Sequence, residues 1–220
     1  MIIGRCIMDV NKQKAYELKM QITAEALEKN NFSAYCVKNK EEAVEKLISL
    51  MNKGDKVGLG GSATLNELGI INLLRGGDYN FVDRYEEGLT REQMVEKLRE
   101  SLLTDVFITS TNAVTEKGEL YNVDGNANRV AAMLFGPTSV IVIAGCNKIV
   151  RDLAEAEQRV KTIAAPANCV RLGKNTPCTK VGTCMDCRSE DRICADRVIM
   201  SRQVQKGRVK VILVAEELGY

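Results

Sequence analysis

The chain has 220 residues but contains no histidine and no tryptophan. Without histidine there is no imidazole base, which excludes a Ser-His-Asp triad, a Cys-His dyad and His-ligated zinc or non-haem iron. Any metal must therefore be bound by cysteine, carboxylate or backbone atoms. Any proton transfer must use Glu, Asp, Lys, Tyr or Cys.

The chain also lacks a strong net charge and a long apolar run. Its 31 Lys and Arg residues against 29 Asp and Glu residues give +2 at pH 7, too balanced for a protein that binds nucleic acid or an anionic membrane surface. No segment approaches the ~20 apolar residues of a transmembrane helix. Residues 1–8 carry Arg5 in their middle and do not form an export signal. We therefore expect a cytoplasmic protein, with Met8 as a more natural start than Met1.

Hydrophobic patterning predicts helices that alternate with strands. We expect helices over residues 9–30, 39–51, 64–74, 90–103, 126–135 and 151–164, and strands over 32–37, 56–59, 80–82, 105–110, 120–123, 139–144 and 209–214. This alternation predicts a three-layer α/β/α fold with a mostly parallel sheet, which a hairpin around Gly118 would make mixed. We expect one domain over residues 9–220, with a cysteine-rich insertion over 169–200.

A glycine-rich turn follows the predicted strand at 56–59. Its candidate ligand-binding residues are Gly60, Gly61, Ser62, Ala63 and Thr64. A turn between a strand and a helix places backbone N–H groups where an anion can bind. The segment has neither the lysine of a P-loop nor the G-x-G-x-x-G spacing. It therefore predicts a phosphate or carboxylate site, and a tight turn that needs glycine for geometry alone is the alternative.

Polar residues gather after the predicted strand at 105–110 and before the helix at 126–135. In open α/β sheets this edge is where ligands bind. Glu116 and Asp124 are the candidate acid or base groups in a chain without histidine. The candidate anion-binding residues are Asn112, Asn126, Asn128 and Arg129. The alternative is an ordinary turn in which Asn and Asp side chains satisfy backbone groups.

Eight cysteines are present, and five of them fall within one short stretch. Cys178, Cys184, Cys187 and Cys194 follow the spacing C-x5-C-x2-C-x6-C, and four soft thiolates in such a loop can bind one ion or one cubane cluster. A single C-x-x-C pair favours a 4Fe-4S cluster, with structural zinc and then redox disulfides or free thiols as alternatives. Cys169 is a spare or alternative ligand. The remaining cysteines, Cys6, Cys36 and Cys146, are expected to be bystanders.

Three segments resemble the LUD domain family, which includes the YkgG-like and LutC-like lactate utilization proteins. They are residues 60–65, residues 109–115 together with 118–120, and residues 124–131, and the likeness extends from about Asp9 over the whole chain. The resemblance implies the fold shared by ribose-5-phosphate isomerase, glucosamine-6-phosphate deaminase and coenzyme A transferases. It also implies that the glycine-rich loop binds phosphate or an acyl group and that Glu116 and Asp124 do proton chemistry. The four-cysteine segment marks a subset of the family.

Two functions from different classes follow. The first is an iron–sulfur protein of a lactate-type oxidation system that passes electrons to, or assembles with, iron–sulfur or oxidase partner subunits. The second is a stand-alone enzyme on a small phosphorylated or carboxylated metabolite, with Glu116 or Asp124 as base or with the cluster as Lewis acid. A zinc-stapled scaffold subunit is a third alternative. We favour the first function. We expect a small anionic metabolite as the ligand, and a homo-oligomer is one expected form of the protein.

Overall fold

A computed structural model describes residues 9–220, so the expectations about the start at Met8 and about Cys6 lie outside the described residues. The longer helices are α1 (Val10–Lys29), α2 (Lys40–Ser49), α4 (Ile70–Gly76), α5 (Arg91–Glu100), α6 (Asn128–Leu134), α7 (Leu153–Arg159) and α8 (Ala165–Arg171). Shorter helices are α3 (Ala63–Glu67) and α9 (Cys178–Val181). The strands are β1 (Ser33–Val37), β2 (Lys56–Leu59), β3 (Asn80–Phe81), β4 (Val106–Thr109), β5 (Ala113–Thr115), β6 (Leu120–Asp124), β7 (Ser139–Gly145), β8 (Ile149–Val150), β9 (Asp196–Met200) and β10 (Val209–Val214).

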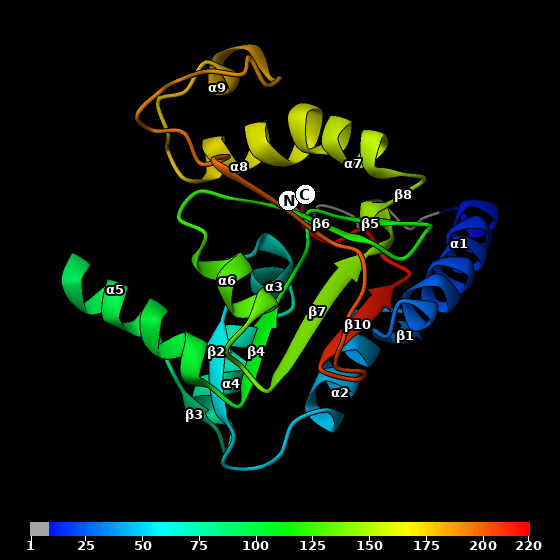
Figure 1. Cartoon of the computed structure of the whole chain (residues 1–220), viewed down its shortest axis with the longest axis horizontal. Coiled ribbons are helices and arrows are strands. Elements are labelled where there is room, and N and C mark those ends of the chain that lie inside the picture. The colour runs from blue at the N-terminus through cyan, green and yellow to red at the C-terminus, as the bar shows by residue number, and fades with distance from the viewer. Residues whose placement is uncertain (1–8) are drawn as a thin grey trace, which may run out of the picture.

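The central sheet has six parallel strands in the order β1-β10-β7-β4-β2-β3 (Figure 1). The predicted mostly parallel α/β fold is therefore confirmed. The hairpin around Gly118 does not join this sheet. Its strands β5 and β6 pair with each other, with β8 and with β9 in a second, four-stranded sheet of order β8-β5-β6-β9.

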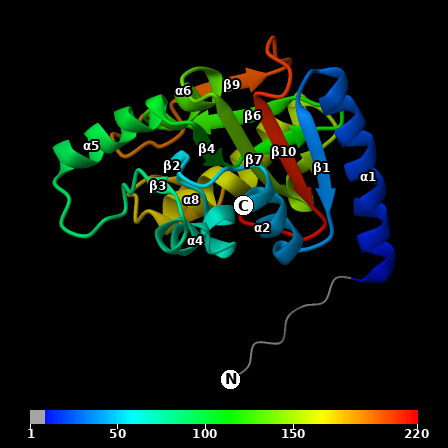
Figure 2. The ribbon, with the colours of Figure 1, turned by 90° about the horizontal axis from the view of Figure 1, so that it is seen from below.

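Helices cover both faces of the central sheet, because alternate residues of its strands point to opposite faces. In β7, Ile141 and Ile143 pack with α2, α3 and α4, whereas Val140 and Val142 pack with α1, α6 and the second sheet. Figures 1 and 2 place α1 and α5 at opposite ends of the molecule. Helix α7 packs on the outer side of the second sheet. In Figure 1, α8 lies to the left of α7, and α9 lies above α8.

Side-chain caps determine where several helices begin. Asn39 Oδ1 accepts a hydrogen bond of 2.8 Å from Glu42 N at the start of α2. Thr90 and Gln93 form a capping box at the start of α5. The helix expected over 64–74 is instead two helices, because Gly69 adopts a left-handed conformation (φ 67°) between them.

The cysteine-rich segment contains more secondary structure than a loop. Cys169 lies in α8, Cys178 begins α9, and β9 pairs with β6 along its whole length. The helix expected over 151–164 also continues, through a π-helical stretch over Val160–Ala164, into α8. Among the helices of residues 9–220, none is both long enough and apolar enough to cross a bilayer.

Candidate anion-binding pocket

A cavity of about 260 Å³ opens at the carboxyl ends of three adjacent parallel strands. Its floor consists of the turns after β2, β4 and β7, which contribute Ser62, Ser110 and Lys148. In open α/β sheets this edge is where ligands bind, because turns from several strands converge there. The pocket is therefore built from segments that are far apart in the sequence.

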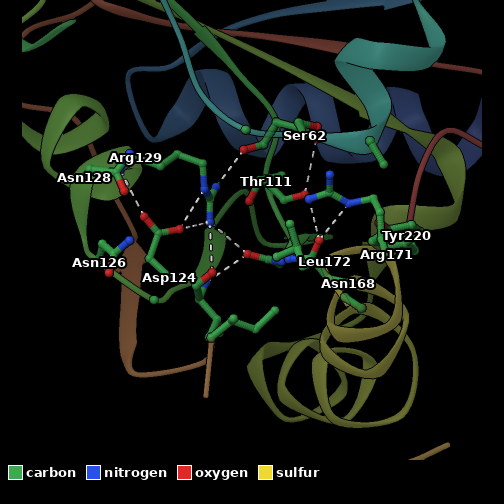
Figure 3. A pocket seen from close by; sticks show the side chains of 18 of the residues that line it. Ser62, Thr111, Asp124, Asn126, Asn128, Arg129, Asn168, Arg171, Leu172 and Tyr220 are labelled. Carbon is green, nitrogen blue, oxygen red and sulfur yellow. Dashed lines mark hydrogen bonds and ion pairs between the residues drawn. The ribbon is translucent and has the colours of Figure 1, made fainter. Parts of the chain in front are cut away.

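The opposite wall comes from outside the central sheet. It includes the segment between β6 and α6, helix α8 and residue Ile193 of the cysteine-rich segment. Figure 3 shows Asp124, Asn126 and Arg129 on one side of the pocket and Asn168, Arg171 and Tyr220 on the other. The wall thus joins the second sheet to the cysteine-rich segment.

The structure brings together most of the predicted pocket residues. The lining includes Gly61, Ser62, Ala63, Asn112, Asp124, Asn126, Asn128 and Arg129. Ser62 makes no side-chain capping bond to α3, so its hydroxyl is available to a ligand.

Gly60 and Thr64 lie just behind this lining rather than in it. A Cβ at Gly60 would be 2.6 Å from Thr109 Oγ1, so this glycine allows close packing of β2 against β4. Thr64 Oγ1 instead accepts a hydrogen bond from Lys148.

Glu116 does not lie in the pocket. It is at the turn of the β5–β6 hairpin, and its carboxylate pairs with Lys19 of α1 at 3.7 Å. The hairpin joins the second sheet and carries this turn away from the carboxyl ends of the central strands. The structure therefore gives no support to Glu116 as the proton carrier of this pocket.

Asp124 lies in the pocket, but all of its acceptor capacity is used. One carboxylate oxygen accepts from Arg129 Nε at 2.8 Å and Nη2 at 2.7 Å. The other accepts from the backbone N–H groups of Arg129 and Val130, each at 3.1 Å. A carboxylate has about four lone-pair sites, so Asp124 anchors the start of α6 rather than serving as a free base.

Arg129 is likewise fully engaged. Besides Asp124 it donates to the Ser110 carbonyl at 2.8 Å and to Asn122 Oδ1 at 2.7 Å. Its Nη2 also donates to Asn112 Oδ1 and to the Val123 carbonyl, each at 3.1 Å. The guanidinium therefore ties the ends of β4 and β6 together (Figure 3).

Two other arginines hold positive charge at the pocket. Arg84 stacks on Tyr85, with 4.7 Å between its Cζ and the ring centroid, and its Nη2 donates to the Tyr85 hydroxyl at 2.9 Å. Its Nε is buried without a hydrogen-bond partner among the described residues. Arg171 holds Asn168 Oδ1 through Nε and Nη2, and its Nη1 is not part of that contact. Neither arginine was singled out by the sequence.

Lys148 is the other functional candidate that the sequence analysis missed. It is 3% exposed, and its Nζ donates to Thr64 Oγ1 at 2.8 Å and to Ser110 Oγ at 3.0 Å. Burial first, and then the charges of Arg159 and Arg129, lower the pKa of Lys148 to about 7. The available signal was a lysine shortly after the most apolar predicted strand, at the edge of the sheet where ligands bind.

The four predicted cysteine ligands lie in one region without meeting at one point. Cys178 is buried beside Thr176, whereas Cys184, Cys187 and Cys194 are half-buried. Burial raises the pKa of the Cys194 thiol; Arg192 opposes the shift, and the nearby Cys184 and Cys187 thiols add to it. Residues 9–220 contain no group of three or more Cys, Asp or Glu side chains placed to hold one metal ion.

The predicted spare ligand, Cys169, lies close to Cys178. Burial raises the pKa of Cys169 to about 11; Thr176 opposes the shift, and Cys178 and Cys194 add to it. Arg192 donates hydrogen bonds to the carbonyls of Cys187 at 2.5 Å and Cys194 at 3.0 Å. All five thiols of the segment therefore belong to one neighbourhood.

A mostly parallel sheet covered by helices, with a cavity at the carboxyl ends of its strands, defines an α/β protein. Comparison with family models identifies the chain more closely. It belongs to the LUD domain family, whose model matches residues 20–214. The resemblance expected from the sequence is thereby confirmed.

Solved structures and curated proteins add two findings. The chain is similar to the crystal structure of a DUF162 family protein from Deinococcus radiodurans, with a TM-score of 0.48 and 16% sequence identity. That match covers 92% of this chain and 98% of the other. A search of the curated proteins finds no match.

Proposed function

We propose that the chain is a lactate utilization-type protein whose pocket binds a small organic carboxylate. The observation that carries this proposal is the imbalance of charge in the pocket. Its lining contains Arg84, Arg129, Lys148 and Arg171 but only one acidic side chain, Asp124. Because Asp124 is already paired with Arg129, the guanidinium groups of Arg84 and Arg171 have no anionic side chain as partner in the lining.

The size of the cavity supports a small ligand. Pockets for drug-sized molecules measure ~300–1,000 Å³, and this one measures about 260 Å³. Arginine binds carboxylates through paired N–H groups. Arg84 has an unpartnered Nε, and Arg171 has an Nη1 that Asn168 does not use. A hydroxycarboxylate would find hydroxyl and amide partners in Ser62, Asn126 and Asn128.

Isothermal titration calorimetry tests this proposal directly. We expect L-lactate, D-lactate or pyruvate to bind the wild-type protein, and we expect the neutral analogue lactamide not to bind. Arg84→Gln and Arg171→Gln should each weaken carboxylate binding roughly tenfold or more, since a hydrogen bond to a charged group contributes ~1.5–3 kcal/mol.

Arg99→Gln is the matched control, because Arg99 is 70% exposed and pairs only with Glu96 on the surface of α5. This variant should bind as the wild type does. Equal affinity for lactate and lactamide, or equal effects of all three arginine variants, would overturn the proposal.

We further infer that the cysteine-rich segment binds a 4Fe-4S cluster. Its support is the neighbourhood of thiols around Cys194, tied together by Arg192, in a chain that has no histidine to compete as ligand. The donor atoms fit iron–sulfur ligation in kind. Loop movement is needed for Cys178, Cys184, Cys187 and Cys194 to reach one cluster. Such a cluster would supply electron transfer to partner oxidation subunits in a reducing cytoplasm.

Metal analysis distinguishes the alternatives. Protein purified without oxygen should be brown, contain iron and acid-labile sulfide, and give a paramagnetic resonance signal on reduction. The double variant Cys184→Ser/Cys187→Ser should lose the cluster, whereas Cys36→Ser, which changes an exposed thiol outside the segment, should keep it. A colourless protein with stoichiometric zinc would replace the electron-transfer role with a zinc-stapled scaffold.

A further inference from the structure

The buried amine of Lys148 has no carboxylate partner among the described residues. Its two hydrogen bonds go to the hydroxyls of Thr64 and Ser110. A buried ammonium ion is costly unless it is paired with a negative charge. The position is therefore unusual for a lysine with a purely structural role.

The directions of the surrounding hydrogen bonds show that the Lys148 amine acts as the donor in both of its bonds. Thr64 Oγ1 donates its own proton to the Leu218 carbonyl at 3.2 Å, and Ser110 Oγ donates to the Thr111 carbonyl at 3.4 Å. Both hydroxyls must therefore accept from Lys148. A neutral amine has two N–H donors and one lone pair, so these two bonds leave the lone pair free.

The charges around Lys148 favour the neutral amine. Arg129 and Arg159 both lie near it and oppose a further positive charge, while Glu67 acts in the opposite direction. Glu67 forms no hydrogen bond or ion pair with Lys148, and its carboxylate instead accepts from Gly219 N at 3.2 Å. Burial and neighbouring cations are the two ways in which proteins make lysine a nucleophile near neutral pH.

We propose that Lys148 binds the carbonyl carbon of a small 2-oxo carboxylate covalently, as an imine. This inference rests on the proposed carboxylate pocket, because Lys148 lines the same cavity as Arg84 and Arg171. The arginines would hold the carboxylate while the carbonyl group faces the floor. The ligand class is thereby narrowed from carboxylates in general to those that carry an adjacent ketone or aldehyde.

The step is balanced without an oxidant or a cofactor. The Nζ lone pair forms a bond to the carbonyl carbon, and the π electron pair of the carbonyl moves to its oxygen. The resulting carbinolamine loses that oxygen as water, together with the two amine protons. Thr64 and Ser110 contact the nitrogen, so their hydroxyls are placed to accept and return protons during the exchange.

Reductive trapping tests the inference. The protein is incubated with pyruvate and sodium cyanoborohydride, and peptide mapping by mass spectrometry locates any reduced adduct. We expect one adduct, on Lys148, that forms faster as the pH rises through about 7. L-lactate, which has no carbonyl group, should give none.

Two variants serve as controls. Lys148→Arg keeps a basic hydrogen-bond donor at this position but removes the nucleophilic amine, and it should give no adduct. Lys53→Arg changes a lysine whose side chain is 87% exposed, and it should leave the adduct on Lys148 unchanged. Circular dichroism checks that each variant is folded. If a variant does not fold, peptide mapping of the wild-type protein still shows whether Lys148 carries the adduct.

The outcomes separate this inference from the proposed function. Calorimetric binding of lactate and pyruvate without an adduct would overturn the imine and leave the carboxylate pocket standing. Adducts spread over exposed lysines would also overturn it. Failure of both ligands to bind would overturn the pocket itself, and the inference with it.

Discussion

The buried basic side chains of this protein differ in whether they have a carboxylate partner. Arg129 is neutralised by Asp124 and has five further hydrogen-bond contacts with the ends of β4 and β6 and with Met133. Lys148 and Arg159 have only neutral acceptors; Arg159 donates to the carbonyls of Asn112 and Asn147. Burial alone lowers the pKa of Arg159 to about 10. The paired Arg129 is therefore structural, whereas Lys148, which also lines the pocket, has no anionic partner.

The buried pair predicts a large effect on stability. Asp124→Ala should lower the free energy of unfolding by about 3–5 kcal/mol, because it leaves the charge of Arg129 buried without a partner. Urea denaturation measures this change. Asp78→Ala is the matched control, since Asp78 pairs with Lys53 on the surface with 70% of its side chain exposed, and it should change stability little. Equal effects of the two variants would contradict the structural role of Asp124.

Lys148 predicts a dependence of stability on pH. Its pKa is about 7 in the folded protein against roughly 10.4 for an unfolded chain. Between these values the unfolded chain binds a proton that the folded protein does not, so stability should rise with pH, by at most ~1.4 kcal/mol per unit. Below pH 7 both states are protonated, and this contribution is at its lowest.

Lys148→Met removes this titration. Denaturation of both proteins from pH 6 to pH 10, in the presence of a reductant, should show a steeper rise for the wild type than for the variant. Titration of other groups is common to both proteins and cancels in the comparison. Parallel curves would show that Lys148 keeps an ordinary pKa, and would remove the support it gives to the imine.

At the scale of elements, α5 is held by its cap rather than by burial. It has no buried residue, and Thr90 and Gln93 form reciprocal bonds at its start. Thr90→Ala should cost the helix ~1 kcal/mol, which appears as faster hydrogen exchange over residues 91–100 and little change in global stability. Thr162→Ala is the control, because Thr162 bonds only to the Gln158 carbonyl of its own helix. Unchanged exchange in α5 would contradict the capping role.

The elements that were predicted well carry local signals. Asn39, Thr90 and Gln93 mark helix starts, and the apolar run over 139–144 marks the central strand β7. The partners of the β5–β6 hairpin were not predictable in this way. They are β8, of two residues, and β9, which lies in a polar, cysteine-rich stretch. Pairing between strands is decided by tertiary packing, which a single sequence does not display.

Because a single sequence does not display tertiary packing, only some of the pocket residues could be predicted from it. Residues next to predicted strand ends, such as Ser62 and Asn126, could be identified because such edges bind ligands. Arg84 reaches the pocket from the segment after β3 and Arg171 from α8, and no local pattern marks either residue. Asp124 and Arg129 were located correctly, but their mutual bond, which removes them from direct chemistry, depends on side-chain geometry.

At the scale of the whole molecule, the cysteine-rich segment and the pocket share a wall. Ile193 lines the cavity, and Ala195 N donates to the Asp124 carbonyl at 2.8 Å. Cys194, a proposed metal ligand, lies between them. Any ligand that orders the cysteine-rich segment therefore also orders one side of the anion site.

This connection predicts that metal and anion binding support each other. Metal-loaded protein should melt at a higher temperature than metal-free protein, because a ligand of the folded state stabilises it. It should also bind carboxylate severalfold more tightly, since the wall at Ile193 is then fixed. Cys184→Ser/Cys187→Ser should abolish both differences and Cys36→Ser should preserve them. Identical melting and affinity with and without metal would contradict the connection.

The central claim is that the cavity at the ends of β2, β4 and β7 binds a small carboxylate. A crystal structure of the protein grown with L-lactate tests it most directly. The account predicts electron density for the ligand inside the cavity, with its carboxylate within hydrogen-bond distance of Arg84 or Arg171. An empty cavity at saturating ligand, or lactate bound elsewhere on the molecule, would contradict the account.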